Sequence, residues 1–172
     1  MNKLAVGFAL AGLIMAAPAH AEGPNYSADA VVGFFLNSID LGATRGICVG
    51  TPQECEAKAK PAGFDMLINF ELDSADLTGV ARDNLDQISR ALKDDRLLSA
   101  HFDIEGYTDA LGGEGYNMTL SQRRAAAVQD FLVSQGIDIS RLNAVGFGEA
   151  TPRVPDAFDP VNRRVEMRIR LQ

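Results

Sequence analysis

The sequence predicts an α+β domain, a two-layer sandwich in which helices cover one face of a small mixed sheet. Stretches of alternating apolar and polar residues, typical of strands with one buried face, recur in the second part of the chain. They lie near residues 64–70, 102–105, 142–147 and 164–171. Two stretches with helical spacing separate the first three strands. The resulting order β-α-β-α-β-β predicts helices packed on one face of a mixed sheet.

The first strand and the first helix are predicted between residues 64 and 92. In the strand, Phe64, Met66, Ile68 and Phe70 alternate with Asp65, Leu67 and Asn69. In the helix, apolar residues three or four positions apart form one face, namely Ala81, Leu85, Ile88 and Leu92. Thr78 precedes them and belongs to a residue type that caps helix N-termini.

Three further strands follow from alternation. The first turns Phe102 and Ile104 inward and Asp103 and Glu105 toward solvent, and it ends at Gly106. The second covers residues 142–147. The last turns Val165, Met167, Ile169 and Leu171 one way, and Arg164, Glu166, Arg168 and Arg170 the other.

The second helix is predicted to begin at a capping box, because Gln122 stands three residues after Thr119. Its apolar face is Val128, Phe131 and Leu132, and Gly136 is its stop. Arg124 then lies in or near the first turn, where positive charge opposes the helix dipole by about 0.3–1 kcal/mol. A bound anion would offset that unfavourable placement.

Residues 1–21 are predicted to be a secretory signal peptide. They hold an early lysine, an apolar run too short to span a membrane, and Ala19-His20-Ala21 as a small-x-small cleavage site. Residues 22–62 form an N-terminal extension in which apolar residues show no sustained helical or strand periodicity. Pro61-Ala62-Gly63 is interpreted as its boundary. Its apolar patch Ala30–Leu36 is expected to be a short helix that docks either on the domain or on another protein.

Cys48 and Cys55 are expected to form a small-loop disulfide, which exported proteins can keep. A metal pair and a redox site are the alternatives. The spacing is not Cys-x-x-Cys and no supporting ligands lie nearby, so the disulfide is favoured.

The net charge of −7 argues against nucleic acid as a partner, because phosphate contacts need clustered lysine and arginine. No cofactor or metal site is expected, since His101 is the only histidine beyond the signal peptide. No nucleophile motif suggests an enzyme. A hydrolase that uses paired carboxylates, such as Glu105 and Asp109, stays open as an alternative.

Asp109 and Arg124 are the candidate site. Asp109 follows the strand that ends at Gly106, and Arg124 lies on the same helix side as Val128. The two charges are therefore expected to face one cleft beside free helix N–H groups, an arrangement that complements a zwitterion. A simple Asp109–Arg124 salt bridge that closes the loop is an equally weighted alternative.

Four ordered motifs carry a family resemblance. They are G-x-T-D at Gly106–Asp109, N-x-x-L-S-x-x-R-A at Asn117–Ala125, G-x-G-E-x-x-P at Gly146–Pro152 and N-R-R-V-E at Asn162–Glu166. Residues 63–172 resemble the OmpA-like peptidoglycan-binding domain. The resemblance implies that Asp109 and Arg124 hold the ammonium and the carboxylate of diaminopimelate in the peptide stem of the cell wall.

The resemblance extends to neighbouring positions. Thr108 and Asn117 match the two ends of the loop, and Leu120 either presents backbone to the ligand or is buried as a hydrophobic staple. Arg163 lies two residues before Val165, so its side chain points to the same side of the strand, and it is expected to support the cleft. Arg164 points to the other side and is expected to be solvated or structural. Tyr107 stands where many members carry histidine and is expected to pack against the loop.

The expected function is therefore non-catalytic binding of peptidoglycan that tethers or positions an envelope protein at the wall. The expected localisation is the periplasm, with an association with the outer membrane left open. The alternative is a periplasmic scaffold whose residues 22–62 recruit an outer-membrane or envelope protein.

Overall fold

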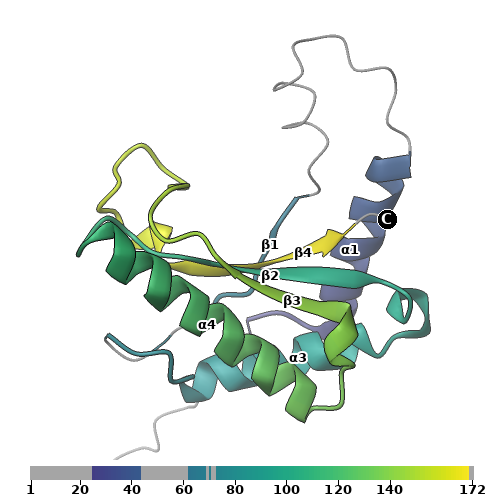
Figure 1. Ribbon diagram of the computed structural model, residues 1–172. Coiled ribbons are helices and arrows are strands. Elements are labelled where there is room, and N and C mark those ends of the chain that lie inside the picture. Colours follow the sequence, from purple (N-terminus) through teal and green to yellow (C-terminus); the bar gives the residue numbers. More distant parts are fainter. Residues whose placement is uncertain (1–24, 44–61, 69, 71–72, 171–172) are drawn as a thin grey trace, which may run out of the picture.

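The computed structural model describes residues 25–43, 62–68, 70 and 73–170 (Figure 1). The predicted signal peptide at residues 1–21 and the predicted Cys48–Cys55 disulfide lie outside the described residues. The main elements are α1 (Ala28–Ala43), β1 (Phe64–Asp65), α3 (Gly79–Leu92), β2 (His101–Tyr107), α4 (Glu114–Ser134), β3 (Leu142–Gly146) and β4 (Arg164–Arg170). Short 3₁₀ turns cover Asp95–Leu97, Ile139–Arg141 and Pro160–Asn162.

The strands form one mixed sheet in the order β1-β4-β2-β3. The central strand β2 pairs with β3 in parallel and with β4 antiparallel, and β4 also pairs antiparallel with β1. Figure 1 shows α3 and α4 against one face of this sheet. The predicted α+β class and the order β-α-β-α-β-β are confirmed.

The core fills the space between that sheet face and the helices. In the register of the sheet, Phe102 pairs with Ile169 and Ile104 with Met167, and these four side chains are 0–3% exposed. The predicted inward parity of β2 and β4 is confirmed. The predicted cap of α3 is confirmed as well, because the Thr78 hydroxyl accepts a hydrogen bond from the Ala81 backbone N–H at 3.2 Å.

Helix α1 belongs to the same core. Val31 and Phe35 are 0% exposed, and the Phe35 ring meets the Phe102 ring edge-on at 5.0 Å between centroids. The patch Ala30–Leu36 therefore docks on the domain, the first of the two predicted alternatives, within a helix longer than the patch. The boundary near residue 62 stays a prediction.

Strand β1 is shorter than the sequence predicts. The expected strand over residues 64–70 is regular only at Phe64–Asp65. Met66 still donates its backbone N–H to the Val165 carbonyl at 3.1 Å, but Leu67 has φ +48°, a left-handed conformation that ends the extended backbone. The Asp65 carboxylate accepts from the Leu67 N–H at 3.0 Å and stabilises this turn.

Helix α4 begins five residues before the predicted capping box. Gly113 is the N-cap residue and Glu114 the first helical residue. The Thr119 hydroxyl donates to the Gly115 carbonyl at 2.9 Å, as threonine does inside a helix. Arg124 therefore lies ten residues beyond the helix start, and the predicted conflict with the helix dipole is wrong.

The other face of the sheet is less exposed than predicted at Glu105. This side chain is 3% exposed overall, and it accepts from the Tyr107 hydroxyl at 2.7 Å and from Arg168 at 3.0 Å. The reason is non-local, because Arg168 comes from β4 and the alternation within β2 contains no sign of it. The prediction of Glu105 as a solvent-facing residue is wrong.

Candidate ligand-binding site

A hollow of about 650 Å³ lies where β2 ends and the chain turns into α4. We call it the Asp109 pocket. Its lining includes all six residues that the sequence singled out: Thr108, Asp109, Asn117, Leu120, Arg124 and Arg163. The remaining lining residues are Phe70, Asp73, Leu111, Gly112 and Tyr116.

Two glycines bring α4 onto the ends of the strands that carry these residues. A Cβ atom on Gly106 of β2 would lie 2.2 Å from the Ser121 carbonyl oxygen, and one on Gly146 of β3 would lie 2.5 Å from the Gln122 backbone nitrogen. No larger residue fits at this distance without moving the helix. These glycines of the G-x-T-D and G-x-G-E motifs therefore set how close Arg124 comes to Asp109.

Asp109 is the buried carboxylate of the pocket, with 5% of its side chain exposed. Its Oδ1 accepts from the Leu111 backbone N–H at 3.2 Å, and its Oδ2 pairs with Arg163 at 2.7 Å. Asp109 thus pairs with Arg163 and not with Arg124, so the predicted loop-closing Asp109–Arg124 salt bridge is wrong. A carboxylate has about four acceptor sites, so these two contacts leave capacity for another donor.

Arg124 is the buried cation, 9% exposed. Its Nε donates to the Ser74 carbonyl at 3.0 Å, and its guanidinium carbon lies 4.9 Å from the centroid of the Phe70 ring. Among the described residues no carboxylate pairs with it. Burial, and after it the charge of Arg163, lower the pKa of Arg124, whereas Asp109 acts to raise it. The N–H groups of its terminal nitrogens remain available to an anion.

Thr108 and Asn117 frame the same pocket. The Thr108 backbone N–H donates to the Gly148 carbonyl at 2.9 Å, but its buried hydroxyl has no hydrogen-bond partner. It is the one such side-chain atom in the described part of the chain, and such atoms are rare in folded proteins. Asn117 donates to the Asp109 carbonyl at 3.2 Å and to Glu149.

Leu120 is 6% exposed and contributes an apolar wall, consistent with the packing role expected for it. Arg164 is structural: its side chain is 9% exposed, pairs with Glu166 at 2.7 Å and lies over the Tyr107 ring at 3.8 Å from the centroid. Tyr107 also stacks on Phe147, which follows β3. The expected packing of Tyr107 against the loop between Thr108 and Asn117 stays a prediction.

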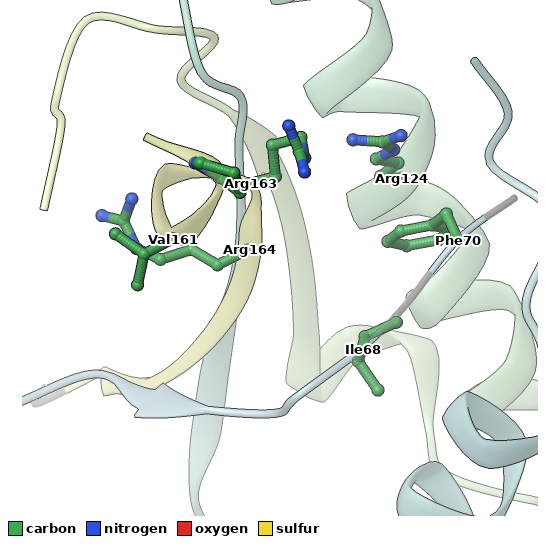
Figure 2. A pocket seen from close by; sticks show the side chains of 7 residues that line it. Ile68, Phe70, Arg124, Val161, Arg163 and Arg164 are labelled. Carbon is green, nitrogen blue, oxygen red and sulfur yellow. The ribbon is translucent and has the colours of Figure 1, made fainter. Parts of the chain in front are cut away.

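A second hollow of about 490 Å³ adjoins the first, and we call it the arginine pocket. It is lined by Ile68, Phe70, Arg124, Pro160, Val161, Arg163 and Arg164. Phe70, Arg124 and Arg163 line both hollows. Figure 2 shows the guanidinium groups of Arg124 and Arg163 turned toward one another, with Phe70 next to Arg124.

The sequence did not predict Phe70 or Tyr116 as site residues. Phe70 was assigned to the buried face of a strand, and its position beyond the end of β1 depends on the turn at Leu67. Tyr116 is in the first turn of α4, which the sequence placed in a loop. Tyr116 and the nearby Gly112 were missed because the sequence pattern did not predict that α4 begins at Glu114.

Comparison with known proteins assigns the chain to a family. The model of the OmpA family matches residues 69–166, and the chain belongs to this family. Outer membrane porin F of Pseudomonas aeruginosa is 30% identical over 98% of this chain and 49% of its own length. Outer membrane protein A of Bordetella avium is 36% identical over 71% of this chain and 66% of its own length.

A solved structure agrees with this assignment. The peptidoglycan-associated lipoprotein from Burkholderia pseudomallei is 29% identical, with a TM-score of 0.54 over 60% of this chain and 88% of that one. The relatives named here are outer-membrane or peptidoglycan-associated proteins and not enzymes by name. Within the described residues, no helix combines the length and the apolar character needed to cross a membrane.

Proposed function

We propose that this chain binds peptidoglycan without catalysis, through the diaminopimelate of the peptide stem. The observation that carries the proposal is the Asp109 pocket itself. It presents a buried carboxylate and a buried guanidinium that no carboxylate of the described residues pairs with, in one hollow that can admit a small molecule. Membership in the OmpA family and the likeness to a peptidoglycan-associated lipoprotein support it.

The free end of the diaminopimelate side chain carries an ammonium and a carboxylate on one carbon. Asp109 receives the ammonium, because its oxygens are the buried negative charge of the pocket. Arg124 receives the carboxylate on its terminal N–H groups. Charge-assisted hydrogen bonds of this kind contribute about 1.5–3 kcal/mol each. Neither group alone distinguishes this headgroup from a simple amine or acid, and the pair does.

The surrounding residues complete the recognition. The Thr108 hydroxyl, which lacks a partner, donates to or accepts from the headgroup. Asn117 holds the Asp109 backbone in place through its hydrogen bond to that carbonyl. Arg163 supports the site by orienting the Asp109 carboxylate through their ion pair before a ligand arrives.

The remaining expectations belong to the same proposal. Residues 1–21 direct export to the periplasm, and the Cys48–Cys55 disulfide closes a small loop in the extension. Residues 22–62 contact an outer-membrane or envelope protein, so that wall binding tethers that partner. Val31, Val32 and Phe35 are buried in the core and are not available for this contact.

Three observations disfavour the hydrolase alternative. Glu105, the second carboxylate such an enzyme would need, does not line the Asp109 pocket. It is also 3% exposed and held by Tyr107 and Arg168. Within the described residues, no group of three His, Cys, Asp or Glu side chains could hold a catalytic metal.

Co-sedimentation with purified sacculi of the diaminopimelate type tests the proposal. Asp109→Ala and Arg124→Ala are expected to lose most of the bound fraction. Asp130→Ala and Arg123→Ala are matched controls, because both residues lie on exposed positions of α4, and they are expected to bind like the parent. Equal binding by folded Asp109→Ala and the parent would refute the site. Lysine-type sacculi test the preference for diaminopimelate.

A further inference from the structure

The arginine pocket is rich in positive charge. Three arginines line it, Arg124, Arg163 and Arg164, and none of its described lining residues is acidic. Arg164 and Arg163 pair with carboxylates that do not line this hollow, Glu166 and Asp109. Arg124 has no such partner among the described residues. The net positive charge of this lining favours an anion, which the Arg124 and Arg163 guanidinium groups can share with the diaminopimelate carboxylate and with Asp109.

The rest of its wall is apolar. Ile68, Phe70 and Val161 (Figure 2) complete the lining together with Pro160. An occupant that suits this wall carries an anionic group next to a small apolar one. A carboxylate fits the arginine pair better than a lone halide, because guanidinium groups bind carboxylates through paired, planar N–H···O contacts.

The two hollows share one boundary. Phe70, Arg124 and Arg163 line both of them. A peptide that places an amino-acid headgroup in the Asp109 pocket can therefore reach the arginine pocket with a neighbouring residue. Burial and, after it, the charge of Arg163 lower the pKa of Arg124. Because Arg124 and Arg163 face each other at this boundary, an anion there also relieves the repulsion between them.

We infer that the arginine pocket binds a second carboxylate of the same stem peptide, next to the diaminopimelate headgroup. This inference rests on the proposed function. A stem peptide offers two such groups: the α-carboxylate of its γ-linked glutamate and the carboxyl terminus of its last alanine. Both have the chemistry that the pocket requires. The consequence is two-point anchoring, in which stems that lack the second charge bind more weakly.

Three synthetic tetrapeptides distinguish the sources. One is the free acid L-Ala-γ-D-Glu-meso-diaminopimelate-D-Ala, the second is amidated at the alanine carboxyl, and the third is amidated at the glutamate α-carboxyl. Binding to the purified exported chain is measured by isothermal titration calorimetry. One of the two amides is expected to bind about tenfold more weakly than the free acid, since a lost charge-assisted hydrogen bond has about that effect. The weaker amide identifies the second carboxylate.

A variant in the second hollow tests the location. Val161 is 40% exposed and lines the arginine pocket but not the Asp109 pocket. Val161→Glu is expected to weaken the free acid about tenfold and the weaker amide clearly less, because the new carboxylate repels the second carboxylate, which that amide lacks. Val161→Gln is the matched control and is expected to bind all three peptides like the parent.

The outcomes separate this inference from the proposed function. If both amides bind as tightly as the free acid, and Asp109→Asn abolishes all binding, the second subsite is refuted and the Asp109 pocket stands. An equal effect of Val161→Glu on the acid and on both amides refutes the location. If the parent binds none of the three peptides, both proposals are refuted.

Discussion

Arg163 forms an ion pair with Asp109 at 2.7 Å between Nη1 and Oδ2, across 54 positions in the sequence. The pair joins the loop after β2 to the residue that precedes β4. It is asymmetric, since 5% of the Asp109 side chain and 46% of the Arg163 side chain are exposed. The buried Asp109 carboxylate therefore takes its counter-charge from Arg163, a long and half-exposed side chain at the mouth of the pocket.

Arg163→Ala is expected to lower the free energy of unfolding by about 1–3 kcal/mol, because it leaves a buried acceptor without its charged partner. A diaminopimelate-containing tripeptide should also raise the melting temperature of this variant less than that of the parent, since Arg163 no longer orients Asp109 before the ligand arrives. Differential scanning calorimetry measures both. Asp109→Asn combined with Arg163→Ala should recover part of the lost stability. An equal ligand effect on variant and parent would contradict this account of Arg163.

Thr108→Val is expected to separate stability from binding. The hydroxyl is buried without a partner, so its replacement by a methyl group should leave the free energy of unfolding unchanged or slightly higher. Peptide affinity should fall about five- to tenfold, the effect of one hydrogen bond worth about 1 kcal/mol or slightly more. Urea denaturation and calorimetric titration provide the two readouts. A loss of stability without a loss of affinity would show that the hydroxyl serves the fold.

Gly106→Ala is expected to destabilise the domain by about 1–3 kcal/mol, the usual effect of forcing extra volume into a packed contact. The added Cβ would lie 2.2 Å from the Ser121 carbonyl oxygen of α4. Peptide affinity should fall too, because α4 carries Arg124. Gly115→Ala is the matched control: nothing lies within 4 Å of its added Cβ, and alanine favours a helix. Denaturant unfolding should show a loss at Gly106 and none at Gly115.

Glu166 should contribute a pH-dependent part of the stability. Burial acts to raise the pKa of Glu166, but hydrogen bonds from Arg164 and Arg153 outweigh it and lower the pKa below the ordinary 4.5. The contribution is thus fully present above pH 4.5 and is lost as the pH falls through the lowered folded-state pKa. The stability difference between the parent and Glu166→Gln should therefore shrink in acid. Denaturation between pH 7 and pH 2 measures it, and a difference independent of pH would contradict it.

The order of elements and the position of the candidate site residues could be predicted because both depend on local patterns. Alternation along β4 placed Val165 and Met167 inward, and both are 0% exposed. The same parity placed Arg163 on the side of the cleft. Asp109 was predicted at the cleft because it follows the end of a strand, and Arg124 because it lies on the apolar side of its helix. The structure places both in one pocket.

The errors of the sequence-based prediction occur where contacts between residues far apart in the sequence determine the structure, or where such contacts outweigh a local pattern. Thr119 offers a capping signal, yet α4 continues through it to Gly113, since helix packing against β2 and β3 outweighs one local hydrogen bond. The burial of Glu105 depends on Arg168 from another strand. The alternative of an Asp109–Arg124 salt bridge is wrong for a similar reason, because two arginines are available and only the fold shows that Arg163 is the one that pairs with Asp109.

The contribution of α1 to the core affects how this family segment can be transplanted. The family match begins at residue 69, whereas Phe35 fills the space beside Phe102 from a helix that ends at Ala43. A fusion protein cut at the edge of the match would expose the Phe102 ring to water and leave a void in its place. A portable version of the module therefore has to carry its own N-terminal helix.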